Sequence, residues 1–212
     1  MQKLQVLAVS LIVSVPLLWG QWTETFPLSN PEQCLRPSGP AVLLNDTLYG
    51  GYNALFAASG TCAPCHGHDP EMLASIDEFG NDVNLVDDWR STMMGNSARD
   101  PLWRAKVSHE GLVNPGHQEA LEDKCTSCHA PLGHFDAHHQ GAASYTIADL
   151  ENDPMGQDGV SCLACHQQVA EGIGSHHSGN LDIDTAKVAY GPYVSPLATP
   201  MVLESGWTPV YS

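Results

Sequence analysis

The longest run of apolar residues lies at the amino terminus. Residues 4–19 are apolar apart from one glutamine and two serines, and they follow Lys3. The run is shorter than a typical bilayer span and is followed directly by Gly20 and a glutamine, so the pattern indicates a signal peptide over residues 1–20. We therefore expect the mature chain to be exported to the periplasm or the extracellular space. A retained membrane anchor is the alternative.

The rest of the chain has few regular apolar periods. Residues 21–52 contain several prolines and predict an irregular N-terminal segment. Apolar residues at helical spacing, together with the helix-starting pairs Asp-Pro and Asn-Pro, predict short helices over about 85–94, 101–111 and 115–125. These stretches favour a mainly α fold with extensive loops.

Two further local patterns occur in the second half of the chain. Ser161 is an N-cap residue type, and we expect its side chain to cap a short helical turn over residues 162–166. Glycine and proline are frequent over residues 178–212, which predicts a loop-rich tail with at most short strands.

Six of the seven cysteines belong to one pattern, Cys-x-x-Cys-His, which occurs three times. In this pattern each cysteine sulfur bonds a vinyl group of haem c, and the histidine supplies the proximal imidazole to the iron. The predicted attachment cysteines and proximal histidines are Cys62, Cys65 and His66; Cys125, Cys128 and His129; and Cys162, Cys165 and His166. We expect three covalently bound haem c groups in a domain over residues 53–177, a multihaem cytochrome c scaffold wrapped round its haems.

Other uses of Cys-x-x-Cys explain the pattern less well. A zinc ribbon pairs two such motifs around one metal and needs no histidine directly after each. A thioredoxin-like dithiol needs one motif within a β-α-β unit. The seventh cysteine, Cys34, stands alone in the irregular segment, so we expect a free thiol or an intermolecular disulfide there.

The charge of the chain narrows the range of partners. The formal net charge is -16, and no basic run is present. Such a chain would repel nucleic acid and anionic lipid headgroups, so neither is an expected partner. An acidic surface favours docking on basic patches of other redox proteins. The alternative is that the acidity serves only to keep the protein soluble.

Each haem iron also needs a sixth ligand, and the chain has more histidines than the motifs use. There are eleven histidines, three of which belong to the motifs. Multihaem chains often take the second imidazole from a segment that belongs to another haem, and His177 is one such candidate. Two other roles are open for the pairs His138-His139 and His176-His177. One is a surface zinc or copper site with Asp136, and the other is simple solvation.

Several stretches resemble the multihaem cytochrome family of the tetrahaem electron carriers of ammonia oxidisers. They read DWRSTMMG at 88–95, DPLW at 100–103, CTSCHAPLGH at 125–134 and GVSC at 159–162. The resemblance covers roughly residues 61–167. It implies a helical multihaem fold and an electron-carrier function.

The resemblance also implies roles for individual residues. Family members usually have a distal histidine where this chain has Met94, and they often have a histidine near the position of His134. We therefore expect Met94 and His134, together with His177, to be sixth iron ligands, with Met93 as the second candidate for a sulfur ligand. Similar members continue past the equivalent of Tyr211 into another Cys-x-x-Cys-His, so we expect this chain to be a truncated member.

The function predicted from these features is electron relay between redox partners by an exported multihaem c-type cytochrome. No serine-hydrolase, phosphate-loop or zinc-protease motif is present. One alternative is a haem oxidoreductase that acts on a small nitrogen or sulfur compound, which requires an open iron and a polar distal pocket. The other is a subunit of a haem filament, formed by self-association.

Overall fold

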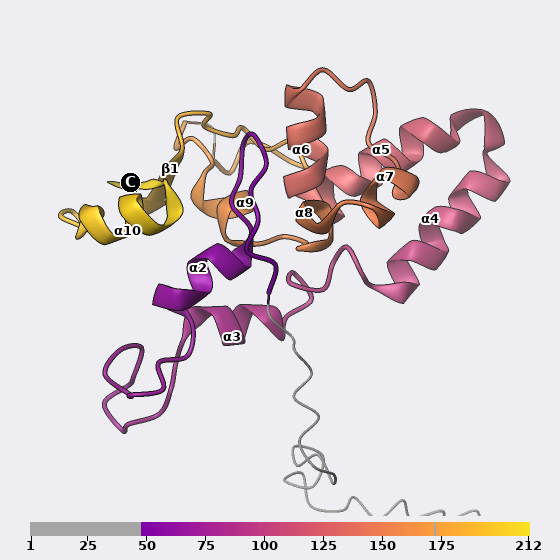
Figure 1. The fold of residues 1–212 in the computed structure, drawn as a ribbon. Coiled ribbons are helices and arrows are strands. Elements are labelled where there is room, and N and C mark those ends of the chain that lie inside the picture. The colour runs from indigo at the N-terminus through magenta and orange to yellow at the C-terminus, as the bar shows by residue number, and fades with distance from the viewer. Residues whose placement is uncertain (1–47, 172) are drawn as a thin grey trace, which may run out of the picture. The chain divides into compact units, whose positions relative to one another are not determined.

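The computed structural model describes residues 48–171 and 173–212, and helices dominate this part of the chain (Figure 1). The predicted signal peptide, most of the irregular N-terminal segment and Cys34 lie outside the described residues. No helix in the described part is long and apolar enough to cross a bilayer. The helices are α2 (Ser59–His66), α3 (Leu85–Arg90), α4 (Pro101–Val113), the 3₁₀ helix η1 (Pro115–His117), α5 (Gln118–His129), α6 (Pro131–His139), α7 (Ile147–Glu151), α8 (Pro154–Gln157), α9 (Cys162–His166) and α10 (Ala198–Ser205). The prediction of a mainly α fold is therefore confirmed.

The helix expected over residues 85–94 is shorter than predicted, because α3 ends at Arg90. Ser91 Oγ donates to the Asp88 carbonyl, and Thr92 Oγ1 donates to the Trp89 carbonyl at 2.7 Å. Such side-chain bonds compete with the continuation of a helix. The two methionines that follow therefore lie in a turn rather than on a helical face.

The two other predicted helices form close to their expected positions. At the start of α4, Asp100 accepts a hydrogen bond from the Leu102 amide at 2.8 Å, with Pro101 in the first turn. The segment after Asn114 is divided into η1 and α5, and α5 continues through the second Cys-x-x-Cys-His motif.

Ser161 precedes α9, but the predicted capping bond is absent. Its side chain makes no cap hydrogen bond, and its buried Oγ has no partner among the described residues. The prediction for this side chain was therefore wrong. Its backbone conformation is extended, as at other helix starts.

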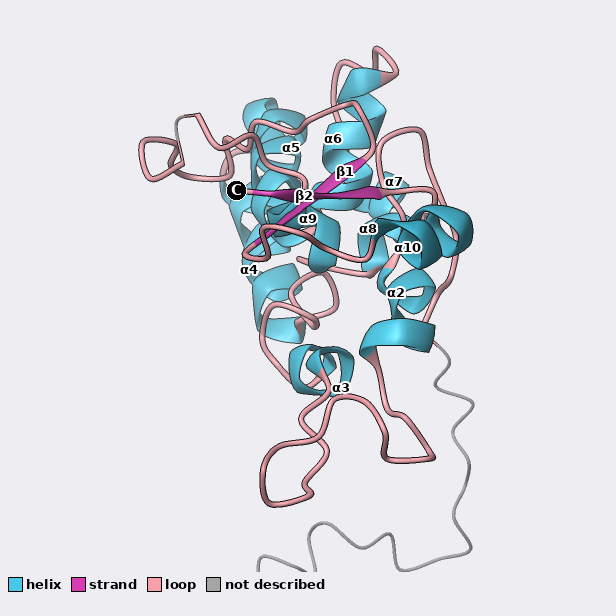
Figure 2. Cartoon of the chain, turned by 90° about the vertical axis from the view of Figure 1, so that its left-hand side faces the viewer, coloured by secondary structure: helices cyan, strands magenta, loops and turns pink. Residues whose placement is uncertain are grey.

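The tail contains more structure than its composition predicted. Strands β1 (Val188–Gly191) and β2 (Thr208–Tyr211) form a two-stranded parallel sheet, and α10 lies between them in sequence (Figure 2). The short strands agree with the prediction, whereas the helix was missed. Gly206 ends α10 in the left-handed conformation with φ 79°, and Trp207 then turns inward and is only 1% exposed.

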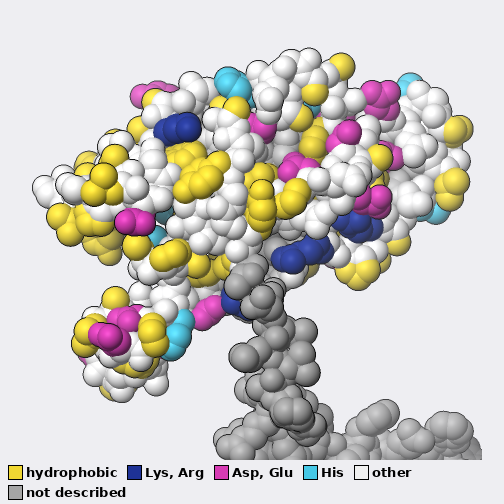
Figure 3. Space-filling view, in the orientation of Figure 1, with side chains coloured by type: hydrophobic (Ala, Val, Ile, Leu, Met, Phe, Trp, Pro, Cys, Tyr) yellow, Lys and Arg dark blue, Asp and Glu magenta, His cyan; other side chains and the backbone are white. Residues whose placement is uncertain are grey.

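The buried apolar residues form two small clusters. The first joins the segment before α2 to α6, α8, α9 and the tail, and it contains Phe56, Leu132, Met155, Leu163 and Trp207. The second lies between α4, α5 and α7 and includes Trp103, Val107, Tyr145 and Leu150. Many large apolar side chains remain at the surface, including several around α10 at the left of the space-filling view (Figure 3).

Candidate functional site

Each Cys-x-x-Cys-His motif lies on a helix: the first on α2, the second at the end of α5 and the third on α9. Residues three apart in a helix lie on the same side, so both sulfurs of a motif point in one general direction. None of the six motif cysteines forms a disulfide. In every motif the first cysteine is half-buried and the second, namely Cys65, Cys128 or Cys165, is exposed. The three motifs therefore present their sulfurs in the same way.

The first and third motifs meet at their first cysteines. The thiols of Cys62 and Cys162 are neighbours, and this proximity together with burial raises the pKa of the Cys62 thiol. Close by, Ser59 donates two hydrogen bonds to the buried Asp158 carboxylate, from its amide at 2.8 Å and from its hydroxyl at 2.7 Å. These contacts connect the start of α2 to the turn that leads into α9.

The second cysteines of the second and third motifs line the same surface hollow. Cys128 and Cys165 line one surface hollow together with apolar and small residues and Gln168. Gly179 forms part of its wall, and a Cβ atom there would lie 2.6 Å from Cys128 Sγ. Its φ of 74° also favours glycine. The tail backbone can approach the motif sulfur this closely only because residue 179 has no side chain.

His129 is held in a fixed orientation. Its Nδ1 lies 3.1 Å from the Ser97 carbonyl oxygen, and Ser97 Oγ donates to the His129 carbonyl at 2.8 Å. The Trp103 ring stacks on the imidazole with a centroid distance of 4.3 Å and an interplanar angle of 6°. When Nδ1 donates to a carbonyl, the lone pair of Nε2 remains available for a metal, as in many ligating histidines.

His166 shows the same use of its Nδ1 atom. This atom lies 2.7 Å from the carbonyl oxygen of Tyr190 on β1. The Tyr190 hydroxyl in turn donates to Asp184 at 2.7 Å. The tail therefore orients the third motif histidine, a role that its composition did not predict. His66 is exposed, and no hydrogen bond to its ring is found in the described residues.

The predicted sixth ligands lie in three different environments. Met94 is 52% exposed, and its carbonyl accepts from the Val160 amide at 3.1 Å, so its backbone lies beside the turn that precedes the third motif. Met93 is 83% exposed. His177 is exposed on the loop after α9. His134 is buried on α6 and lies among polar side chains of α5 and α6.

His134 belongs to a cluster of three polar side chains, with Asp123 and His138. Asp123 on α5 lies 2.7 Å from His138 Nε2 and 3.5 Å from His134 Nδ1, in both cases through its Oδ1 atom. Burial lowers the pKa of His134 to about 4. Burial of Asp123 opposes ionisation, but hydrogen bonds from His138 and from the Tyr145 amide outweigh it and lower the pKa of this carboxyl. Asp123 was not predicted from the sequence. The spacing of the two histidines, one helical turn apart, was the signal available for this cluster.

The pairing of His138 with Asp136, considered from the sequence, does not occur. Asp136 Oδ1 instead accepts from the Leu55 amide at 3.0 Å. His139, the neighbour of His138, is exposed at the end of α6. The two adjacent histidines therefore have different surroundings.

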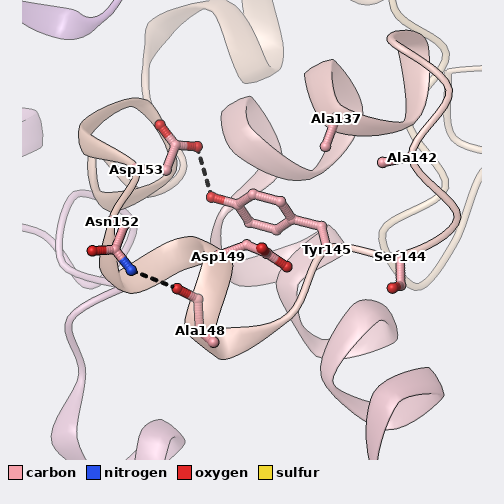
Figure 4. Close-up of a pocket in the computed structure, with 8 residues that line it drawn as sticks. All are labelled: Ala137, Ala142, Ser144, Tyr145, Ala148, Asp149, Asn152 and Asp153. Carbon is pink, nitrogen blue, oxygen red and sulfur yellow. Dashed lines mark hydrogen bonds between the residues drawn. The ribbon is translucent and has the colours of Figure 1, made fainter.

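A second hollow lies beside Tyr145, between the end of α6 and the α7–α8 segment (Figure 4). Its lining includes Asp149, Asn152 and Asp153, and it contains none of the predicted haem residues. The Tyr145 hydroxyl donates to Asp153 at 2.7 Å, and burial followed by this bond raises the pKa of Tyr145. The tyrosine therefore stays protonated and acts as a hydrogen-bond donor.

Three buried side-chain polar atoms lack a hydrogen-bond partner among the described residues: Thr61 Oγ1, Trp103 Nε1 and Ser161 Oγ. Thr61 and Ser161 each directly precede the first cysteine of a motif, and Trp103 stacks on His129. Buried polar groups nearly always have partners, so these three atoms are exceptions. The donor set of each motif fits haem c: two thiols three residues apart on a helix for the two vinyl groups, and an imidazole directly after them for the iron.

Comparison with known proteins found no matching family model, no matching curated protein and no matching solved structure.

Proposed function

We propose that this chain is an exported multihaem c-type cytochrome that relays electrons between redox partners, with one haem c attached at each motif. The observation that carries the proposal is the closeness of the three motifs: Cys62 is a neighbour of Cys162, and Cys128 and Cys165 line the same hollow. When bound, haem supplies an iron that takes up and releases one electron. A relay needs several such groups close together, and the adjacent attachment points support this.

The orientation of the motif histidines also supports haem binding. The Nδ1 atoms of His129 and His166 both lie within hydrogen-bond distance of backbone carbonyls, which favours Nε2 as the atom for iron. The exposed second cysteines are accessible for thioether formation at haem vinyl groups. The residues of the chain thus hold two of the three motif imidazoles in place and expose the second cysteine of each motif.

Electron relay needs only haems that lie close together, whereas a haem enzyme needs an acid–base group beside an open iron. Carbon monoxide binding distinguishes the two, because it requires an open position on the iron.

Met94 and His177 are proposed sixth iron ligands on the evidence of sequence pattern and resemblance. The position of Met94 beside the turn before the third motif supports a role there. His177 lies on the exposed loop after the third motif. His134 is also a proposed iron ligand, on the evidence of the resemblance. Comparison of the His134→Gln and His138→Gln variants tests this role.

The proposed partners are redox proteins that present basic surfaces, because the chain carries a net charge of -16. Association with such partners should weaken as salt screens these charges. The proposed location is the periplasm or the extracellular space, where haem c is attached. This location rests on the signal-like N-terminal sequence.

The test is production of the chain with haem-maturation machinery, followed by intact-mass measurement. We expect three covalent haems, and replacement of Cys62 and Cys65 by serine should remove one. Cys34→Ser is the matched control and should retain all three. Reduced protein that does not bind carbon monoxide would support relay, whereas rapid binding would favour the enzyme alternative. A chain without covalent haem would overturn the proposal.

A further inference from the structure

We propose that Asp123, His134 and His138 bind one Zn²⁺ ion, at a site separate from the three haem motifs. The three side chains come from two adjacent helices, α5 and α6. Their ligand atoms all lie within 4.8 Å of one another. This proposal does not depend on haem binding.

The helical spacing explains why the two imidazoles meet. His134 and His138 are four residues apart on α6, so they lie on the same face, and their ring centroids are 4.5 Å apart. Two histidines one turn apart on a helix are a recurrent zinc-binding pair. Asp123 reaches them from α5, which is joined to α6 through Ala130 alone.

The distances suit a tetrahedral ion after a small adjustment. With metal–ligand bonds of about 2.1 Å, ligand atoms in a tetrahedral zinc site are about 3.4 Å apart. The separation of His134 Nδ1 from Asp123 Oδ1 is 3.5 Å, which is close to this value. The separation of His138 Nε2 from Asp123 Oδ1 is 2.7 Å, the length of a hydrogen bond, so zinc must replace a proton there and separate the two atoms slightly.

The hydrogen bonds around Asp123 fix the orientation of its carboxylate. The Tyr145 amide donates to Oδ1 at 2.8 Å, and His138 bonds the same atom. A carboxylate oxygen has two lone pairs, so Oδ1 can keep its bond to the Tyr145 amide while the ion replaces the proton shared with His138. The backbone thus orients the oxygen that faces both histidines.

Donor type favours zinc over calcium and magnesium, and the burial of the site leaves room for access from solvent. The His134 side chain is 10% exposed, whereas Asp123 and His138 are 25% and 32% exposed, so an ion has a path from solvent to a mostly enclosed site. Imidazole nitrogen suits zinc, while calcium and magnesium prefer sites made of oxygen atoms alone. Three protein ligands leave one position for water.

The site would strengthen the attachment of α6 to the helix that carries the second motif. Asp123 lies on α5 two residues before Cys125, and Thr126 Oγ1 lies 3.2 Å from His134 Nδ1. A bound ion that favours the folded state raises stability according to its concentration and affinity. We therefore expect zinc to raise the melting temperature of the mature protein.

The experiment is equilibrium dialysis of the mature full-length protein against Zn²⁺ after treatment with a chelator. Zinc is measured by mass spectrometry, and haem is measured on the same sample. We expect one zinc per chain, unaffected by excess Ca²⁺ or Mg²⁺. Asp123→Asn and His138→Gln should each weaken zinc binding by about 100-fold or more, because loss of a ligand exceeds the effect of losing an outer partner. His139→Gln is the matched control and should bind zinc like the wild type.

Two results would overturn the zinc site. One is a wild-type protein that retains no zinc, and the other is unchanged zinc binding in His138→Gln. If His134→Gln alters the low-spin haem spectrum while His138→Gln binds zinc normally, His134 is an iron ligand and the zinc site is wrong. His138 is partly exposed, so its variant remains testable even if substitution of the buried His134 prevents folding. Loss of haem with retained zinc would contradict the proposed function alone.

Discussion

Ser59 donates both its amide and its hydroxyl to the carboxylate of Asp158, across 99 positions of the sequence. The pair joins the start of α2 to the turn before α9, and both residues are buried. It therefore holds the first and third motifs together. Replacement of one partner leaves the other with unmet hydrogen-bonding capacity in a buried place.

We expect Asp158→Asn to lower the free energy of unfolding by about 1.5–3 kcal/mol, because hydrogen bonds to a buried charged group are lost or weakened. Denaturant unfolding measures this change. Glu78→Gln, at an exposed position, is the control and should have little effect. Equal stability of the two variants would show that the pair contributes nothing to the fold.

The stacking of Trp103 on His129 predicts an effect on a single haem. Trp103→Leu removes the ring that lies 4.3 Å from the imidazole. We expect one of the three proposed midpoint potentials to shift and the other two to stay nearly constant, as measured by potentiometric titration. Leu102→Ala, at a 78% exposed position on the same helix, should leave all three unchanged. Identical titrations of Trp103→Leu and wild type would argue against a role for the stack.

Met94 is the proposed sulfur ligand, and thioether ligation stabilises ferrous iron relative to imidazole. Met94→His should therefore lower one potential, and Met94→Ala should abolish the sulfur-to-iron charge-transfer band. Met93→Ala, at the more exposed neighbour, is the control and should retain the band. If the wild type lacks this band and Met94→Ala changes neither spectrum nor potentials, Met94 is not a ligand.

Trp207 predicts that the tail is needed for stability. This residue is 1% exposed, and its Nε1 donates to Gln167 Oε1 at 2.8 Å. We expect Trp207→Ala to cost about 3–5 kcal/mol of unfolding free energy, as is typical for loss of a large buried ring. Tyr193→Ala, at a 75% exposed position, should cost far less. Rapid proteolysis of the wild-type tail under native conditions would contradict this account.

The lowered pKa of Asp149 predicts that the free energy of unfolding depends slightly on pH. Hydrogen bonds from Thr146, first from its hydroxyl and then from its amide, lower the pKa of Asp149 below its ordinary 3.8. A carboxyl whose pKa is lower in the folded state stabilises the protein above its unfolded pKa, and this contribution disappears as the pH falls through the folded pKa. We expect Asp149→Asn to be less stable than wild type by about 0.5 kcal/mol at neutral pH, because the pair is largely solvated.

The difference between Asp149→Asn and wild type should vanish once the pH lies below the folded pKa. Unfolding measured over a range of pH values follows this convergence. The comparison variant is Asp88→Asn. The Asp88 side chain is exposed and lies in the first turn of α3. A constant difference between wild type and Asp149→Asn at every pH would mean that the carboxylate charge is not the cause.

The sequence alone identified the three motifs and predicted α3, α4, the segment of η1 and α5, and the turn of α9, whereas α2, α6, α7, α8 and α10 were not predicted. Attachment of haem c depends on residues within five consecutive positions, so the pattern is readable without knowledge of the fold. Helices such as α4 were also predictable, because Asp100 and Pro101 act on the backbone directly beside them. The early end of α3 was not predicted. The side chains of Ser91 and Thr92 donate to carbonyls of the last turn, and these bonds compete with the backbone amides that would continue the helix.

Only the tertiary structure decided which distant residues meet. It paired Cys62 with Cys162, placed the Tyr190 carbonyl beside His166 and brought Asp123 to two histidines of α6. Such contacts depend on how helices pack, and packing is determined by the whole set of buried side chains rather than by local spacing. For the same reason the tail was expected to be mostly loop: its helix gains stability from the burial of Trp207 against residues far away in the sequence, which its own composition does not reveal.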